Sequence, residues 1–270
     1  YKGFKKLYTE EKLFNQIISP NKNLKILPEP IKLNKKWLDE FYQDTNNSDN
    51  FIEIGPGTGA LTNQINKENI NITAVDIDAN NIEILKKKFK GPANFHFIHE
   101  DILKFRFKDS EDDQRIIGNL PYNISTQIIL KLINSYQEIK DMHFLVQKEV
   151  AQKITGQVAT KDWGKLAIKI SAFFDSEILF DVPPDAFDIR PKVNSSFIRL
   201  LPKKDLDYGL AIKDNLYKII DLAFSSKRKN IKNNLKKLNI DWHKANIDPT
   251  KRSEEVSLNN FINLAKEYLA

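Results

Sequence analysis

Residues 53–59 read EIGPGTG and join the apolar run Phe51–Ile54 to an amphipathic stretch that begins near Leu61. Glycine is needed where a backbone turns sharply and approaches a ligand without a Cβ in the way. A strand, a glycine turn and a helix in this order are typical of a nucleotide-binding α/β sheet, although a plain strand-to-helix turn has the same pattern.

Three further residues narrow the class of ligand. Pro56 lacks the N–H that a loop cradling a pyrophosphate would use. Asp76 ends the next apolar run, about twenty residues on, where a carboxylate accepts hydrogen bonds from both hydroxyls of a ribose. Asp101 follows the third run, where it can accept from the amine of adenine, although an isolated acid is also an ordinary solvated loop residue. The pattern favours a nucleoside without a diphosphate, and S-adenosylmethionine is the common cofactor of that description.

The whole chain predicts an α/β domain followed by a small helical one, because apolar runs alternate with amphipathic stretches only as far as Pro202. The predicted strands are Phe51–Ile54, Ile72–Val75, Phe95–Ile98, Arg115–Ile117, His143–Val146, Ile178–Val182 and Ser196–Leu200. The predicted helices are Leu61–Gln64, Asn80–Phe89, Thr126–Ser135, Lys148–Ile154, Gly164–Phe174, Asp214–Phe224, Lys227–Leu238 and Leu258–Leu269. We expect Ser257 to cap the last helix and Trp163 to be a packing anchor rather than an RNA-stacking residue.

Composition excludes several classes of protein. The 270 residues carry a formal charge of +6 and no cysteine, so disulfide frameworks and thiolate metal sites are excluded. No apolar run approaches about eighteen residues, so we expect no membrane-spanning helix. The four histidines have no third ligand near them in sequence, and we expect no metal site. We expect a cytoplasmic monomer, with an organelle after removal of a transit peptide as the alternative.

Positive charge is concentrated near the C-terminus. Ile231, Leu235 and Leu238 mark the buried stripe of the predicted helix, and its exposed part then carries unbalanced cations. The cations of this segment are Lys227, Arg228, Lys229, Lys232 and Lys236. A solvated helix face is one explanation, but the imbalance favours a polyanionic partner such as nucleic acid.

Residues 119–122 read NLPY and follow the fourth predicted strand, at the end of a parallel sheet where ligands bind. An aromatic amine is a poor nucleophile because its lone pair is delocalised into the ring. The Asn119 side-chain oxygen and the Leu120 carbonyl, held rigid by Pro121, can accept hydrogen bonds from such an amine and favour its pyramidal geometry. Tyr122 offers a face on which the base can stack, worth about 1–3 kcal/mol. An ordinary turn with a packed tyrosine is the alternative.

With these motifs in this order, the chain resembles the ribosomal RNA adenine dimethyltransferase family, whose members dimethylate two adjacent adenines in small-subunit RNA. The matching segments are EIGPGTGALT at 53–62, AVDID at 74–78, EDILKF at 100–105, NLPYNIST at 119–126, QKEVAQKI at 147–154, VPPDAF at 182–187, PKVNSSFIRL at 191–200, AFSSKRKNIKNNL at 223–235 and RSEEVSLNNFINLA at 252–265. The resemblance implies a Rossmann-like class I methyltransferase sheet of seven mostly parallel strands with a small C-terminal helical domain. The implied domains are an atypical extension at 1–30, the methyltransferase domain at 31–202 and a helical RNA-binding domain at 203–270.

The resemblance also implies a role for individual residues. The implied cofactor is S-adenosylmethionine, and the residues expected to bind it are Glu53, Gly55, Gly57, Asp76, Ile77, Asp101, Ile102 and Asn119. The residues expected to hold the target base are Asn119, Leu120, Pro121, Tyr122 and Phe187, with the two aromatic rings sandwiching it. The implied partner is small-subunit ribosomal RNA in the small ribosomal subunit, gripped by Lys227, Arg228, Lys229, Lys232 and Lys236. The target base must leave its stack to reach such a pocket.

Three departures from the family pattern keep two alternatives open. The Gly-Gln-Asn-Phe-Leu-like segment that closes over cofactor and target has no match near residues 28–31, which read PEPI. The Phe-x-Pro-x-Pro segment reads FDIRP at 187–191, and Asp76 stands where Glu is commoner. One alternative is a non-catalytic or weakly catalytic relative that binds RNA or DNA, such as an assembly checkpoint or an organellar transcription factor. The other is a large-subunit ribosomal RNA adenine methyltransferase.

Overall fold

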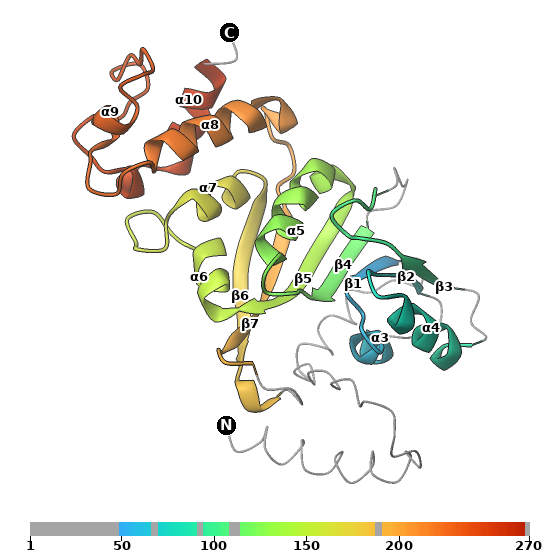
Figure 1. Cartoon of the computed structure of the whole chain (residues 1–270). Coiled ribbons are helices and arrows are strands. Elements are labelled where there is room, and N and C mark those ends of the chain that lie inside the picture. The colour runs from blue at the N-terminus through green and yellow to red at the C-terminus, as the bar shows by residue number, and fades with distance from the viewer. Residues whose placement is uncertain (1–48, 66–69, 91–93, 108–113, 187–190, 268–270) are drawn as a thin grey trace.

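The computed structural model describes residues 49–65, 70–90, 94–107, 114–186 and 191–267 (Figure 1). The predictions for the extension at 1–30, for the segment at 28–31 and for Phe187 lie outside these residues.

A seven-stranded sheet forms the centre of the molecule (Figure 1). Its strands are β1 (Asn50–Ile54), β2 (Asn71–Asp76), β3 (Phe95–His99), β4 (Gln114–Asn119), β5 (Ile139–Gln147), β6 (Phe174–Val182) and β7 (Ser195–Pro202). They lie in the order β3-β2-β1-β4-β5-β7-β6; β1 to β5 are parallel, and β7 runs antiparallel to both of its neighbours. The predicted mostly parallel sheet is confirmed. Its strand order reverses between β1 and β4, the point at which ligands bind to such sheets.

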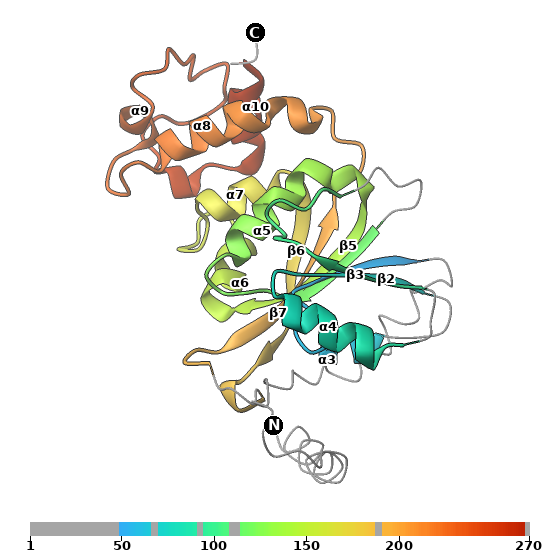
Figure 2. The same cartoon turned by 45° about the vertical axis from the view of Figure 1, so that its right-hand side comes forward.

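Helices cover both faces of the sheet (Figures 1 and 2). The helices of the first two-thirds are α3 (Ala60–Ile65), α4 (Ala79–Lys88), α5 (Ser125–Leu132), α6 (Lys148–Ile154) and α7 (Lys165–Ser171). Right-handed crossovers place α3 and α4 on one face and α5 on the other, because the chain winds in opposite directions from β1 and from β4. The predicted helix Thr126–Ser135 is too long, since after Leu132 the chain tightens into the 3₁₀ helix η1 (Ile133–Glu138).

The C-terminal segment is helical, as predicted. Its elements are η3 (Gly209–Ile212), α8 (Lys213–Ala223), α9 (Ile231–Asn234), η4 (Ser253–Glu255) and α10 (Leu258–Glu267). α8 packs against α7 and α10, and one hydrophobic core continues from the sheet into these helices. Ser257 accepts a hydrogen bond from the Asn260 N–H at 3.3 Å, which confirms the predicted cap. Trp163 is buried and donates its Nε1–H to the Val256 carbonyl at 2.9 Å, so it is a packing anchor.

The predicted helix Lys227–Leu238 is wrong, because the helix there is only α9. Asn230 has an extended backbone, and its side chain accepts from the Asn233 N–H at 3.0 Å, so the helix begins after it. The buried Asn234 side chain donates to the carbonyls of Ala223 and Ser226 at 2.6 and 3.1 Å. These bonds hold residues 224–230 in a turn against the end of α8. The predicted burial of Ile231 is confirmed.

A buried charge cluster lies in the amino-terminal half of the sheet. Arg115 on β4, 2% exposed, donates from Nε and Nη2 to the two carboxylate oxygens of Asp141 at 3.0 and 2.6 Å. Its Nη1 donates to Asp49 at 3.2 Å, and its guanidinium lies 5.3 Å from the ring centroid of Phe51. The cluster joins β1, β4 and β5, so the loss of one partner would leave an uncompensated charge buried among the central strands.

In the described part of the chain, no helix is long and apolar enough to cross a membrane. Over the same ranges, no three His, Asp or Glu side chains lie together as metal ligands would.

Candidate active site

The loop after β1 is held by glycines in left-handed conformations. Gly55 and Gly57 have φ angles of 65° and 56°, which L side chains rarely adopt. The Gly55 N–H donates to the Val75 carbonyl at 2.9 Å, which ties the loop to the end of β2. A Cβ at Gly55 would lie 3.8 Å from the Asn119 carbonyl oxygen, whereas a Cβ at Gly57 would meet no described atom within 4 Å. The loop is therefore open over Gly57 and close to the NLPY segment at Gly55.

Glu53 is a buried carboxyl beneath this loop, 1% exposed. Thr62 on α3 donates its hydroxyl to Oε2 at 2.6 Å, and Oε1 has no hydrogen-bond partner among the described residues. Burial raises the pKa of Glu53 from 4.5 to about 7, and the Thr62 bonds lower it only in part. Glu53 therefore offers a buried acceptor at the carboxyl end of β1 to a ligand that brings a donor.

Asp76 ends β2 and ties the glycine loop to the following helix. Its Oδ2 accepts from the Gly57 N–H and from Asn81 Nδ2, both at 3.1 Å, and its Oδ1 accepts from the Asp78 N–H at 2.8 Å. A carboxylate has about four lone-pair sites, so these three bonds leave room for one more donor. Asp76 can accept from one ribose hydroxyl as it stands, and a second hydroxyl would replace one of the present donors.

Asp101 lies in the turn after β3, at the same edge of the sheet. Its Oδ1 accepts from the Leu103 N–H at 2.9 Å, and Oδ2 accepts no hydrogen bond from the described residues. Ile77, after β2, is 69% exposed, and His99 Nε2 lies 3.0 Å from its carbonyl. Ile102 instead packs its side chain in the core. Of the two predicted isoleucines, therefore, only Ile77 presents an apolar side chain to a ligand.

The NLPY segment begins inside the sheet rather than after it, because Asn119 is the last residue of β4. Asn119 is exposed, while Leu120 is buried and donates its N–H to the Leu145 carbonyl at 3.2 Å. The Tyr122 hydroxyl lies 2.6 Å from Ser195 Oγ at the start of β7, which fixes the orientation of the ring. Ser125 Oγ, at the start of α5, donates to the Tyr122 carbonyl at 3.3 Å. These bonds make the turn a rigid platform beside the glycine loop.

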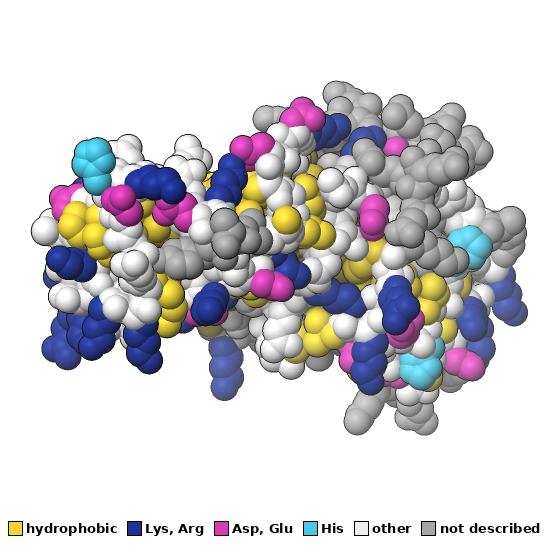
Figure 3. All heavy atoms as spheres, turned by 90° about the horizontal axis from the view of Figure 1, so that it is seen from above, with side chains coloured by type: hydrophobic (Ala, Val, Ile, Leu, Met, Phe, Trp, Pro, Cys, Tyr) yellow, Lys and Arg dark blue, Asp and Glu magenta, His cyan; other side chains and the backbone are white. Residues whose placement is uncertain are grey.

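The five predicted RNA-binding cations are all exposed, but they do not lie on one helix. Only Lys232 belongs to α9; residues 227–229 lie in the turn before it, and Lys236 follows it. None of the five has an ion-pair partner among the described residues. Figure 3 shows lysine and arginine side chains gathered at the end of the molecule formed by the C-terminal helices. Figure 1 places these helices above α7, away from the starts of α5 and α6.

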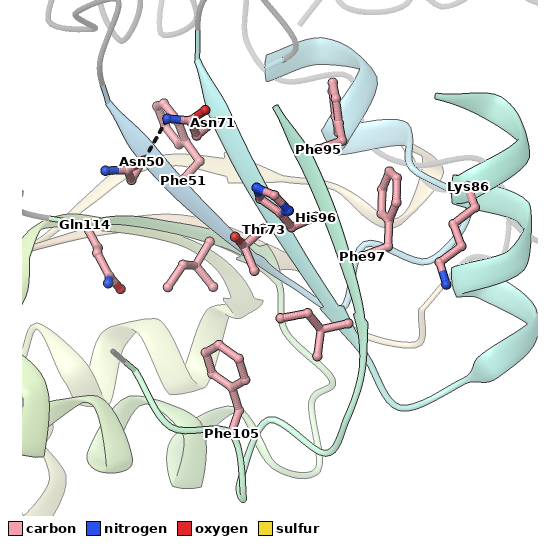
Figure 4. Close-up of a pocket in the computed structure, with 12 residues that line it drawn as sticks. Asn50, Phe51, Asn71, Thr73, Lys86, Phe95, His96, Phe97, Phe105 and Gln114 are labelled. Carbon is pink, nitrogen blue, oxygen red and sulfur yellow. Dashed lines mark hydrogen bonds between the residues drawn. The ribbon is translucent and has the colours of Figure 1, made fainter. Parts of the chain in front are cut away.

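A separate hollow of about 890 Å³ lies beside the amino-terminal halves of β1 and β2 and along most of β3 (Figure 4). Its lining residues come from both faces of the edge strand β3, since Phe97 and His96 alternate along it. The Asn71 side chain donates to Asn50 Oδ1 at 3.0 Å in its wall. None of the described cofactor or target residues lines this hollow, so we place the active site at the other end of the strands.

Sequence reasoning missed the residues that hold the site together. Thr62, Asn81 and Ser195 contact Glu53, Asp76 and Tyr122, respectively. Only Thr62 follows from a sequence signal, because it lies on the helix that the glycine loop begins. The contact to Ser195 joins residues 73 positions apart, which no local pattern reveals.

The mostly parallel sheet has the order β3-β2-β1-β4-β5-β7-β6 with an antiparallel β7, a glycine loop after β1, an acid at the end of β2 and a polar residue at the end of β4. This is the arrangement of a class I S-adenosylmethionine-dependent methyltransferase. Residues 7–269 match the family described as ribosomal RNA adenine dimethylase. The chain therefore belongs to the ribosomal RNA adenine dimethylase family. By this homology it is an rRNA adenine N6,N6-dimethyltransferase with S-adenosylmethionine as its cofactor.

Individual relatives agree with this membership. The chain is 39% identical over 223 residues to the ribosomal RNA small subunit methyltransferase A of Saccharophagus degradans, covering 81% of this chain and 83% of that protein. It is 35% identical over 254 residues to the protein of the same name from Neisseria gonorrhoeae, covering 88% and 97% of the two chains. The crystal structure of a dimethyladenosine transferase from Plasmodium falciparum superposes with a TM-score of 0.73 at 25% identity, over 88% of this chain and 97% of that one.

The residues of the site fit S-adenosylmethionine. Glu53 Oε1 is a buried acceptor without a described partner, which suits an ammonium or another N–H donor. The open space over Gly57 leaves room for a ligand against the loop, and the exposed Ile77 offers an apolar contact for an adenine ring.

Proposed function

We propose that the protein dimethylates adenine N6 in small-subunit ribosomal RNA. The observation that carries the proposal is the approach of the glycine loop to Asn119, where a Cβ at Gly55 would lie 3.8 Å from the Asn119 carbonyl. A methyl donor bound on the glycine loop and a target amine bound at Asn119 would therefore meet at one edge of the sheet. The enzyme then acts mainly by proximity and alignment, which account for about 7–11 kcal/mol in well-oriented reactions.

The cofactor would lie along the carboxyl ends of β1, β2 and β3. Glu53 and the loop from Gly55 to Gly57 hold its methionine end, because that is where the buried acceptor and the open space lie. Asp76 accepts from the ribose, and Oδ2 of Asp101, which accepts no hydrogen bond from the described residues, accepts from the adenine amine. Ile77 contacts the face of the adenine ring.

The target amine would be held by Asn119 and Leu120. The Asn119 side-chain oxygen and the Leu120 carbonyl accept the two N–H groups of the amine and favour its pyramidal form. The bound cofactor supplies an electrophilic methyl group. No strong base is needed, since the proton can leave after the methyl has added. The Tyr122 ring, held by Ser195, stacks on one face of the base. The predicted role of Phe187 at the other face concerns a residue outside the described ranges and stays a prediction.

The basic C-terminal segment supports RNA as the substrate. The exposed cations of residues 227–229 lack ion-pair partners within the described chain and lie away from the start of α5, where the target base would bind. A substrate that contacts both places must be large and polyanionic, which fits structured RNA better than a small molecule.

Methyl transfer to isolated ribosomal subunits tests the proposal. Purified protein is incubated with methyl-labelled S-adenosylmethionine and unmethylated small or large subunits, and the label in each RNA is counted. We expect label in small-subunit RNA alone. Label in large-subunit RNA would favour the large-subunit alternative, and subunit binding without label would favour the non-catalytic one. The monomeric state and cytoplasmic location stay predictions.

A further inference from the structure

Lys131, in the last turn of α5, holds the turn that carries Asp101. Its Nζ donates to the Ile102 carbonyl at 2.8 Å and to the Phe105 carbonyl at 2.5 Å. Within the turn, the Asp101 carbonyl accepts from the N–H groups of Lys104 and Phe105 at 2.8 and 2.9 Å. The turn is thus closed by its own backbone, and the Lys131 ammonium ties two of its carbonyls to α5, while Ile102 and Phe105 pack in the core shared with that helix.

The electrostatic surroundings of Lys131 suit this contact. Partial burial lowers the pKa of Lys131, while the carboxylates of Asp101 and Glu100 oppose that change. The ammonium lies 5.9 Å from the ring centroid of Phe107, which also attracts it. Hydrogen bonds from a charged donor to carbonyls are stronger than those between neutral groups.

The same helix also contacts the proposed target platform. Ser125, the first residue of α5, donates to the Tyr122 carbonyl, and Lys131 contacts the Asp101 turn near the other end of the helix. A hydrogen-bonded helix is rigid over this length. α5 therefore connects the place where the base would stack to the place where the cofactor's adenine would bind.

We propose that Lys131 is a positioning residue for the adenine of the cofactor. By holding the Ile102 and Phe105 carbonyls, it fixes the turn in the form in which Asp101 uses Oδ1 internally and keeps Oδ2 for the adenine amine. Lys131 itself touches neither substrate. The inference rests on the proposed assignment of Asp101 to the adenine.

The test measures the dissociation constant of S-adenosylhomocysteine by calorimetry, together with kcat at saturating cofactor. Lys131→Met keeps the length and apolar stem of the side chain but removes its donors, and we expect it to raise the dissociation constant about tenfold or more, in line with the loss of charged hydrogen bonds. We expect kcat at saturating cofactor to change by less than about threefold, because the hydrogen bonds of Lys131 go to the turn that carries Asp101 and not to Asn119 or Leu120. Lys131→Arg, which retains charge and donors, should restore binding in part.

The adenine-specific readout is the affinity for S-inosylhomocysteine, in which an oxygen replaces the amine. The wild-type protein should prefer the adenine compound, and Lys131→Met should reduce that preference, whereas a merely structural role would weaken both compounds equally and overturn the proposal. Lys104→Met is the matched control, because Lys104 is exposed in the same turn and has no ion-pair partner among the described residues; it should bind as the wild type does. If Lys131→Met does not fold, Lys131→Gln gives the same comparison.

Asp101→Asn separates the two proposals. If Asp101→Asn binds both compounds like the wild type, the assignment of the adenine site is wrong. If Asp101→Asn loses the preference for the adenine compound over the inosine compound, while Lys131→Met and Lys131→Gln keep that preference, only the role of Lys131 is overturned.

Discussion

Glu53 makes the cofactor-free protein less stable as the pH rises, and replacing it with glutamine should remove that effect. Burial disfavours the ionised carboxylate, so the folded protein holds the proton up to about pH 7, whereas the unfolded chain releases it near pH 4.5. Below pH 4.5 Glu53 is protonated in both the folded and the unfolded protein, so its ionisation does not lower the free energy of unfolding. Between these values folding stability falls as the pH rises, because the unfolded state binds fewer protons.

The size of the effect follows from the two pKa values. Raising the pKa from 4.5 to about 7 corresponds to about 3 kcal/mol at 1.36 kcal/mol per pKa unit. Most of this loss, about 2.5 kcal/mol, develops between pH 5 and pH 8. Glu53→Gln has the shape of the protonated acid, cannot ionise, and still offers an oxygen to the Thr62 hydroxyl. Its stability relative to the wild type should therefore increase by about 2.5 kcal/mol over that range.

Urea unfolding of the cofactor-free proteins at pH 5 and pH 8 measures this difference. Glu149→Gln is the matched control, because Glu149 on α6 is exposed, and it should show no such gain. A Glu53→Gln variant whose stability relative to the wild type is the same at both pH values, within about 0.5 kcal/mol, would show that burial does not raise the pKa of Glu53.

Three further predictions concern the buried charges, the target platform and the RNA surface. Arg115→Met leaves the Asp141 carboxylate buried without its guanidinium and should lower the free energy of unfolding by about 3–5 kcal/mol in urea titrations; a loss below about 1 kcal/mol would mean that the cluster is not stabilising. Tyr122→Phe removes only the hydrogen bond to Ser195 and should lower the free energy of unfolding by about 1 kcal/mol. Tyr122→Ala also loses the ring on which the base stacks and should raise the KM for RNA about 5- to 150-fold. Equal KM values in the two variants would contradict stacking. Alanine at residues 227–229 should reduce the slope of log binding constant against log salt by about 2–3 while leaving cofactor affinity unchanged, and an unaltered slope would place the RNA surface elsewhere.

The sheet could be predicted because its signals are local. Each strand is a short apolar run, and the polar residues Asp76, Asp101 and Asn119 come where such runs end, so a parallel sheet brings them to one edge. The helix predicted over residues 227–238 failed for a local reason too. Apolar spacing at Ile231 and Leu235 is real, but the Asn230 cap and the Asn234 side chain limit the helix to four residues.

The residues that hold the site in place could not be predicted from the sequence, because their contacts join distant parts of the chain. Lys131 on an amphipathic helix has the pattern of an ordinary solvated cation, and only the packing of α5 against the turn after β3 shows its two carbonyl partners. In the same way, Asp76 was predicted as a ribose ligand, yet it also fixes Gly57 of the glycine loop. Residue type and spacing predicted the groups that we assign to the ligands, but not the groups that hold those side chains in place.

The most direct test of the account is single-turnover methyl transfer to unmethylated small-subunit RNA by Asn119→Ala, with the cofactor dissociation constant measured in parallel. Asn123→Ala, at an exposed asparagine four residues on, is the control. The amine clamp at the end of β4 predicts a rate reduced by about 100-fold or more with cofactor affinity within about threefold of the wild type, while the control retains both. Transfer by Asn119→Ala at near the wild-type rate would contradict it.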